Sequence, residues 1–110
     1  MGQSFVSPIA NLVISAGATG SSVISGIKDA RALCIFAPAS PATLTGSIKI
    51  QAYPTAGANP RDLTSGGADI TINAGDAVVL TDVVYPKIRL LSSLAEGAQR
   101  TFNVTKRWED

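Results

Sequence analysis

Glycine and proline interrupt this chain so often that no long helix fits between them. They gather with other small residues at residues 16–20, 38–41, 54–60, 65–67 and 73–76. Glycine adopts positive φ freely, and proline fixes φ and lacks an N–H, so both residues favour turns and weaken helix interiors. The segments between these clusters are short and rich in β-branched residues. This spacing predicts an all-β sandwich or barrel.

Several segments alternate between apolar and polar residues. Residues 47–53, 69–73, 87–90 and 101–105 each follow this pattern. A period of two with polar partners is typical of a half-buried strand in an antiparallel sheet. The residues expected to face the core are Ile48, Ile50, Ala52, Ile70, Ile72, Ile88, Leu90, Phe102 and Val104.

Two segments, 32–36 and 77–80, are apolar on both faces. They are expected to be central strands, or strands whose outer face meets a partner. With further strands at 9–14 and 22–27, the total is about eight, the usual number for a jelly roll. We therefore expect a single antiparallel β-sandwich, jelly-roll-like, over residues 9–110, preceded by an N-terminal arm or edge strand over residues 1–8. One short helical turn is predicted at 94–96, ended by Gly97.

Length and composition limit the function. A chain of 110 residues fits one domain. The formal net charge is +1 and no segment carries a basic stripe, which disfavours nucleic acid as a partner. No apolar run approaches the roughly 18 residues that would span a bilayer, and the first residues lack a secretory signal. We expect a soluble protein made in a cytoplasm, with no membrane partner.

The chain offers little for catalysis. It has no histidine, which removes the commonest general base and metal ligand. The single cysteine, Cys34, lies in an apolar segment and is expected to be a buried structural thiol. The glycines do not form a phosphate-binding loop. An enzyme is thus the weakest hypothesis, and no catalytic residue, cofactor or metal is expected. Calcium bound between the loops of four aspartates remains conceivable, although no ligand spacing supports it; these are Asp62, Asp69, Asp76 and Asp82.

The two ends of the sequence carry candidate partner-binding residues. Phe5 and Val6 stand outside the periodic pattern, in either a terminal edge strand or an arm that docks on a neighbour. Arg107 and Trp108 lie near the other end, where the tryptophan caps the open end of the core or is an exposed anchor. Tryptophan and arginine are enriched in interface hot spots.

The order of the strand segments adds a resemblance. It is carried by residues 21–24, 31–38, 44–51, 69–75, 85–93 and 100–104. Over roughly residues 20–105 the chain resembles small β-sandwich virion structural proteins of tailed bacteriophages, of the capsid decoration (cement) type. It departs from that pattern at residues 53–57, where a Ser-x-Asp-Gly hairpin would be expected. The resemblance implies a homo-oligomer, often a trimer, bound to the major capsid protein on the capsid surface of the virion after synthesis in the host bacterial cytoplasm. It implies no catalytic residues.

Two other functions stay open at this point. The protein could belong to the phage tail or to the head-to-tail connector. It could instead be a carbohydrate-binding β-sandwich module, which would need exposed aromatic side chains on one face. Tyr53, Tyr85 and Trp108 are the candidates, and they are scattered along the sequence.

Overall fold

The computed structural model describes residues 4–38 and 44–109. Twelve strands and no helix occur in this part of the chain. The helical turn predicted at 94–96 is wrong. Residues 93–99 form an irregular loop instead, because the Glu96 side chain turns inward to bind backbone groups of another loop.

The first sheet, called sheet 1 below, has the strand order β1, β12, β4, β10. Its strands are β1 (Ser4–Pro8), β12 (Arg100–Glu109), β4 (Ala32–Phe36) and β10 (Ala77–Thr81), and each pairs with its neighbour antiparallel. The short strand β2 (Leu12–Ile14) pairs with the start of β12. It lies on the same side of β12 as β1, which pairs with the end of β12.

The second sheet, called sheet 2, has the order β3, β11, β5, β6, with β9 also paired to β5. These strands are β3 (Ile24–Ser25), β11 (Lys87–Ser92), β5 (Ile48–Tyr53), β6 (Arg61–Asp62) and β9 (Thr71–Ile72). A small hairpin of β7 (Thr64–Ser65) and β8 (Ala68–Asp69) extends from it. The hairpin turns on Gly66 and Gly67, whose φ values of 62° and 85° explain why glycine stands at both positions.

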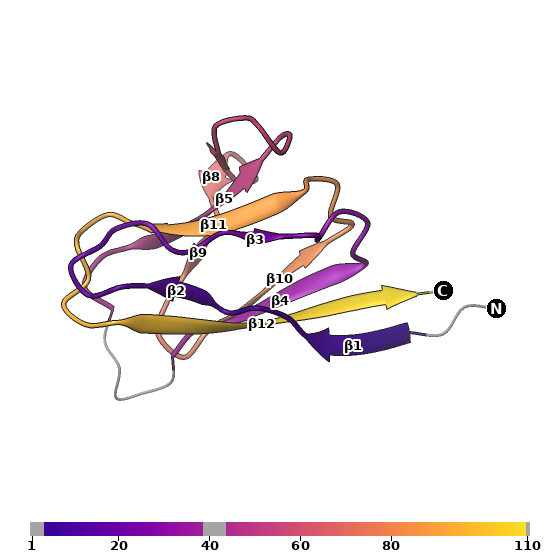
Figure 1. Cartoon of the computed structure of the whole chain (residues 1–110). Coiled ribbons are helices and arrows are strands. Elements are labelled where there is room, and N and C mark those ends of the chain that lie inside the picture. Colours follow the sequence, from indigo (N-terminus) through magenta and orange to yellow (C-terminus); the bar gives the residue numbers. More distant parts are fainter. Residues whose placement is uncertain (1–3, 39–43, 110) are drawn as a thin grey trace.

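The two sheets enclose one hydrophobic core (Figure 1). All but one of the residues expected to face inward are buried in it, and Ile70 is partly buried against it. The prediction of an all-β antiparallel sandwich is therefore confirmed. The strand count differs because short pairings divide predicted strands: the segment 69–73 contributes to both β8 and β9.

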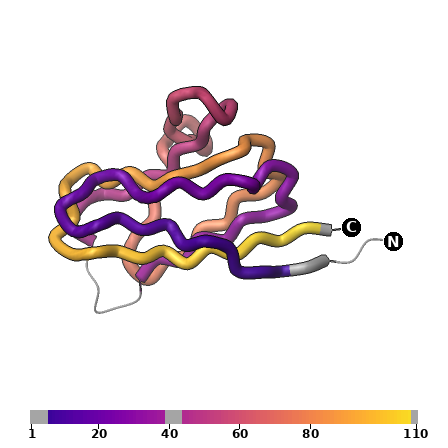
Figure 2. The backbone as a smooth tube through the Cα atoms, in the orientation of Figure 1, coloured from indigo at the N-terminus to yellow at the C-terminus, as the bar shows by residue number. Residues whose placement is uncertain are grey.

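The two chain ends meet in space. β1 and the end of β12 lie side by side and extend past the strands of sheet 2, so both ends of the chain lie at one end of the molecule (Figures 1 and 2). β1 is an edge strand of sheet 1. β10 is the opposite edge strand of the same sheet.

Candidate interaction surface

The four candidate partner-binding residues come together in one strand pair. In the β1–β12 register Phe5 stands opposite Trp108, and Val6 stands opposite Arg107. The sequence suggested each pair separately, from opposite ends of the chain. The structure thus brings them into a single ladder. Arg107 and Trp108 lie on opposite faces of sheet 1, since successive residues of a strand point to opposite faces, and Val6 shares the face of Arg107.

Trp108 lies on the face of sheet 1 that continues the core. Phe102 and Val104 of the same strand are buried there, and Lys106 and Trp108 follow at the same period. The Lys106 Nζ lies 5.9 Å from the centroid of the Trp108 ring and donates to the Gly26 carbonyl at 3.1 Å. These two side chains line a hollow of about 480 Å³ at the open end of the sandwich, together with Ser7, Ile9, Lys28 and Asp29.

The opposite, outer face of sheet 1 is apolar. Three side chains on it are large, hydrophobic and exposed: Val6 is 67% exposed, Val79 58% and Phe36 41%. The paired registers place the outer-face residues in three rows across the sheet: Val6, Arg107, Ala32 and Thr81; Pro8, Thr105, Cys34 and Val79; Asn103, Phe36 and Ala77. Arg107 is the charged residue in these three rows, and the β1–β12 ladder continues beyond them to the pair of Ser4 and Glu109.

The outer face of sheet 2 is polar and internally bonded. Lys49 Nζ contacts Asp62 Oδ2 at 2.8 Å, and Gln51 Nε2 donates to Asp62 Oδ1 at 2.8 Å. Arg89 Nε donates to Gln51 Oε1 at 2.8 Å. The hydrogen bonds from Lys49 and Gln51 lower the pKa of Asp62, and the bond to Asp62 raises the pKa of Lys49. A surface whose polar groups bind one another is suited to solvent, whereas the outer face of sheet 1 is suited to a partner.

Of the two alternatives for residues 32–36 and 77–80, the central position holds for β4 and not for β10. This strand is apolar on both faces, yet it lies at the edge of its sheet and exposes Val79. β4 is central and also keeps Phe36 exposed on the same outer face.

Cys34 lies in the middle of this outer face. Its side chain is half-buried, and burial raises the pKa of the thiol. A thiol with a raised pKa is mostly protonated near neutral pH and is a poor nucleophile. The residue therefore acts as a small apolar side chain of the face, less deeply buried than the sequence indicated.

A buried carboxylate that the sequence did not single out ties three loops together. Glu96 is 1% exposed. Its Oε1 accepts from Thr45 N–H and Arg100 Nε, both at 2.9 Å. Its Oε2 accepts from Gly46 N–H at 2.9 Å and Ser92 Oγ at 2.8 Å. Burial alone would raise the pKa of Glu96, but these donors outweigh it and lower the pKa to about 2.

The Glu96 backbone extends the same link to a third loop. Its N–H donates to the Ala18 carbonyl at 3.0 Å, and its carbonyl accepts from Gly17 at 2.7 Å. With every polar atom of the carboxylate occupied, this arrangement fixes loops and offers no free group for catalysis. No signal in the sequence distinguishes Glu96 from a loop residue, because its donors lie up to 51 residues away.

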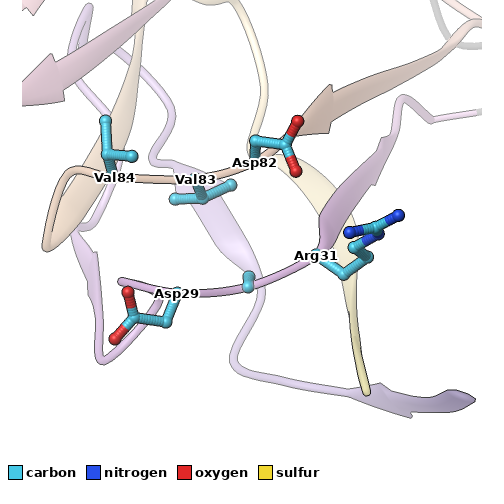
Figure 3. Close-up of a pocket in the computed structure, with 6 residues that line it drawn as sticks. Asp29, Arg31, Asp82, Val83 and Val84 are labelled. Atoms are coloured by element: carbon cyan, nitrogen blue, oxygen red, sulfur yellow. The ribbon is translucent and has the colours of Figure 1, made fainter. Parts of the chain in front are cut away.

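A second hollow, of about 380 Å³, lies between two turns at the end of the sandwich (Figure 3). Asp29 and Asp82 have φ values of 72° and 49°, a region that aspartate tolerates better than most residues. The turns are held together by backbone bonds from Asp29 N–H to the Val83 carbonyl at 2.9 Å and from Asp82 N–H to the Arg31 carbonyl at 3.0 Å. In Figure 3 the two carboxylates point away from each other, so they do not form a common binding site.

The four aspartates considered for calcium do not gather into one site. Asp62 belongs to the polar ladder of sheet 2. Asp76 accepts from Asn73 N–H at 3.1 Å, a hydrogen bond within its own turn. Across residues 4–38 and 44–109, no group of three or more acidic or cysteine side chains is placed to hold a metal ion.

The aromatic side chains considered for sugar binding lie on different elements. Tyr53 is half-buried on β5, Tyr85 packs against the core in the loop before β11, and Trp108 belongs to sheet 1. Burial raises the pKa of Tyr85. Separate positions of this kind do not make the aromatic platform that a carbohydrate-binding module needs.

Comparison with known proteins establishes the fold and leaves the function open. No protein-family model matches the chain, and no curated protein matches it. Among solved structures, the SPBc2 prophage-derived protein YomS is similar with a TM-score of 0.61 at 11% identity, over 97% of this chain and 95% of that one. A structure described as Bacillus endospore appendages that form a family of disulfide-linked pili is similar with a TM-score of 0.54 at 16% identity, over 98% and 89%. No segment of the described chain forms an apolar helix of membrane-spanning length.

Proposed function

We propose that this protein is a non-enzymatic structural component of a tailed-phage virion that binds and stabilises the capsid exterior as a decoration (cement) protein. The observation that carries the proposal is the apolar outer face of sheet 1, with Val6, Phe36 and Val79 exposed on it. The other broad face is polar and internally hydrogen-bonded. One partner-facing side and one solvent-facing side suit a protein that lies on a larger surface.

The similar structures support an assembled role. One is a prophage-derived protein and the other belongs to pili, both with the same fold over nearly the whole chain. The resemblance of the strand segments to phage decoration proteins points the same way. The major capsid protein is the partner that this proposal names.

Attachment through such a face would depend on the large number of copies bound to one capsid. Burying exposed apolar side chains releases about 25 cal/mol per Å², so a few valines and one phenylalanine give modest affinity per copy. Many copies that bind only the assembled shell nevertheless raise its stability by mass action, and multivalency adds to the effect.

Co-sedimentation with undecorated capsids of the encoding phage tests the proposal. We expect saturable binding at a fixed ratio to capsid subunits. Phe36→Glu places a charge on the outer face, at the end of a central strand, and is expected to weaken binding by about tenfold or more. Thr71→Glu, an exposed change on sheet 2, is the matched control and should bind normally.

Two results would count against the proposal. If the folded wild-type protein does not bind capsids, the capsid role is wrong, and the tail or head-to-tail connector becomes the next candidate. If Phe36→Glu binds as well as the wild type, the outer face of sheet 1 is not the attachment surface.

A further inference from the structure

We propose that copies of this chain associate head to tail, with the free edge of β10 pairing to β1 of the next copy. This inference concerns contacts between copies and does not depend on capsid binding. It rests on the backbone groups that the two edges of sheet 1 present.

β10 presents an edge with which no described strand pairs. Ala37 N–H donates to the Asp76 carbonyl at 2.9 Å, and Asp82 N–H donates to the Arg31 carbonyl at 3.0 Å. Since antiparallel strands bond at alternate residues, the N–H and C=O groups of Ala77, Val79 and Thr81 point away from β4. The strand contains no charge and no proline, which are the usual protections of an edge against pairing with another chain.

β1 presents the matching edge on the other side of the sheet. Ile9 N–H donates to the Val104 carbonyl at 3.0 Å, so by the same alternation the backbone groups of Ser4, Val6 and Pro8 point away from β12. β1 and β10 have five residues each, and neither carries a charge.

The two edges are compatible in strand direction and in the sheet face on which their side chains lie. Sheet 1 has four successive antiparallel strands, so β1 of a second copy can lie antiparallel to β10 while keeping the orientation it has in its own sheet. Val6 and Val79 both lie on the outer face, as do the other outward-bonding residues of their strands. With Val6 of one copy opposite Val79 of another, the apolar outer face continues across the junction.

Pairing of identical edges is less favourable. Two β10 strands paired over their full length around Val79 would set Asp76 opposite the Asp82 of the second copy at both ends, and facing like charges are destabilising. Two β1 strands paired around Val6 would set Pro8, which lacks an N–H, against Ser4 at both ends. Pairing of β10 with β1 brings in one proline and no facing carboxylates.

A head-to-tail interface repeats from copy to copy. It closes into a ring, such as the trimer that the resemblance to decoration proteins implies, if a whole number of the rotations between copies makes a full turn. It forms an open fibre if it does not.

Sedimentation velocity over a wide concentration range tests the proposal with two proline variants. Val79→Pro and Val6→Pro each remove an N–H that points to a free edge, so neither breaks a bond inside the sheet. We expect the wild type to associate and each variant alone to be monomeric, with self-association weakened by about tenfold or more. Val79→Pro keeps an intact β1 edge and Val6→Pro keeps an intact β10 edge. Mixing the two variants should therefore restore one interface and give a 1:1 dimer.

Thermal unfolding shows whether each variant is folded, and Thr81→Pro is the second variant for the β10 edge, since its N–H points the same way. Val79→Thr keeps the N–H and should associate like the wild type. A wild type that stays monomeric would overturn the proposal, as would a folded Val79→Pro that associates normally. Loss of association in Val79→Pro but not in Val6→Pro would assign the interface to two β10 strands instead, and a mixture that stays monomeric would exclude the head-to-tail arrangement.

Discussion

At the scale of single residues, Glu96 shows how a small sandwich without a disulfide fixes its loops. Thr45 and Gly46 donate their N–H groups to its carboxylate in place of a strand partner, and Arg100 balances its charge. A buried charge is tolerated only when it is paired and fully hydrogen-bonded, and this one is both.

Replacing Glu96 by glutamine should remove a pH-dependent part of the stability. The folded-state pKa of about 2 lies below the ordinary value of 4.5, so the carboxylate stabilises the fold above about pH 4.5 and loses this contribution as pH falls through 2. The shift corresponds to about 3 kcal/mol. Urea unfolding across this pH range should show the free energy of unfolding falling more steeply in the wild type than in Glu96→Gln.

The control for this prediction is Asp62→Asn. Asp62 is exposed, and exposed ion pairs contribute little to stability, so this variant should keep nearly all of the wild-type acid response. A Glu96→Gln protein that loses stability in acid as steeply as the wild type would show that Glu96 is not the group that titrates.

Gly46 is required because another loop passes too close to it to leave room for a side chain. A Cβ atom at this position would collide with Ser92 Oγ and lie 2.6 Å from the backbone nitrogen of Leu94. Gly46→Ala should therefore cost about 1–3 kcal/mol, measured by urea unfolding. Gly57→Ala meets no atom within 4 Å and should change the stability little. Equal stability of the two variants would show that the loop moves aside without cost.

At the scale of elements, β4 separates a buried face from an outer face within one strand. Leu33 and Ile35 are fully buried, while Cys34 between them is half-buried on the outer face. Burial raises the pKa of the thiol above its ordinary value of 9.0. The rate of alkylation should therefore rise with pH along a curve whose midpoint lies above 9.0 in the folded protein. The urea-unfolded chain is the control and should show the ordinary midpoint; a folded-state midpoint at or below 9.0 would contradict the assigned burial.

The same alternation explains how much of the fold the sequence predicts. Strands such as 47–53 and 101–105 were predictable because apolar and polar residues alternate in them, and this alternation indicates which residues are buried. Partners distant in sequence were not predictable. The pairing of Phe5 with Trp108, and the donors that surround Glu96, depend on which strands become neighbours, and periodicity does not encode that order.

The candidate interaction surface was half predictable for a related reason. Val6 and Arg107 were singled out by residue type and position near the chain ends, and they lie on the outer face. Phe36 and Val79 were expected only as parts of apolar strands. Their exposure follows from the strand order, which places β10 at an edge and leaves the outer side of β4 uncovered by any described residue.

At the scale of the whole molecule, the two broad faces of the sandwich differ in a way that a freely soluble monomer does not need. The polar side chains on the outer face of sheet 2 form hydrogen bonds with one another. Sheet 1 instead exposes apolar side chains and has two edge strands without charged residues. The face and the edges share Val6 and Val79, so variants at these two positions affect both surfaces, whereas Phe36→Glu changes the face and leaves both edges intact.

Decorated capsids should consequently resist heating better than bare ones. A partner present at 100 times its dissociation constant stabilises the bound state by about 2.7 kcal/mol per site, and sites add over the shell. Capsids saturated with the wild-type protein should therefore rupture at a higher temperature in a dye-release assay, Phe36→Glu should give no shift at the same concentration, and Thr71→Glu should match the wild type. Val79→Pro should give a smaller shift than the wild type, because it keeps Phe36 on the outer face but loses both the Val79 side chain of that face and the contact between copies. Capsids that bind the wild-type protein without any rise in rupture temperature would mean that it attaches to the shell without cementing it.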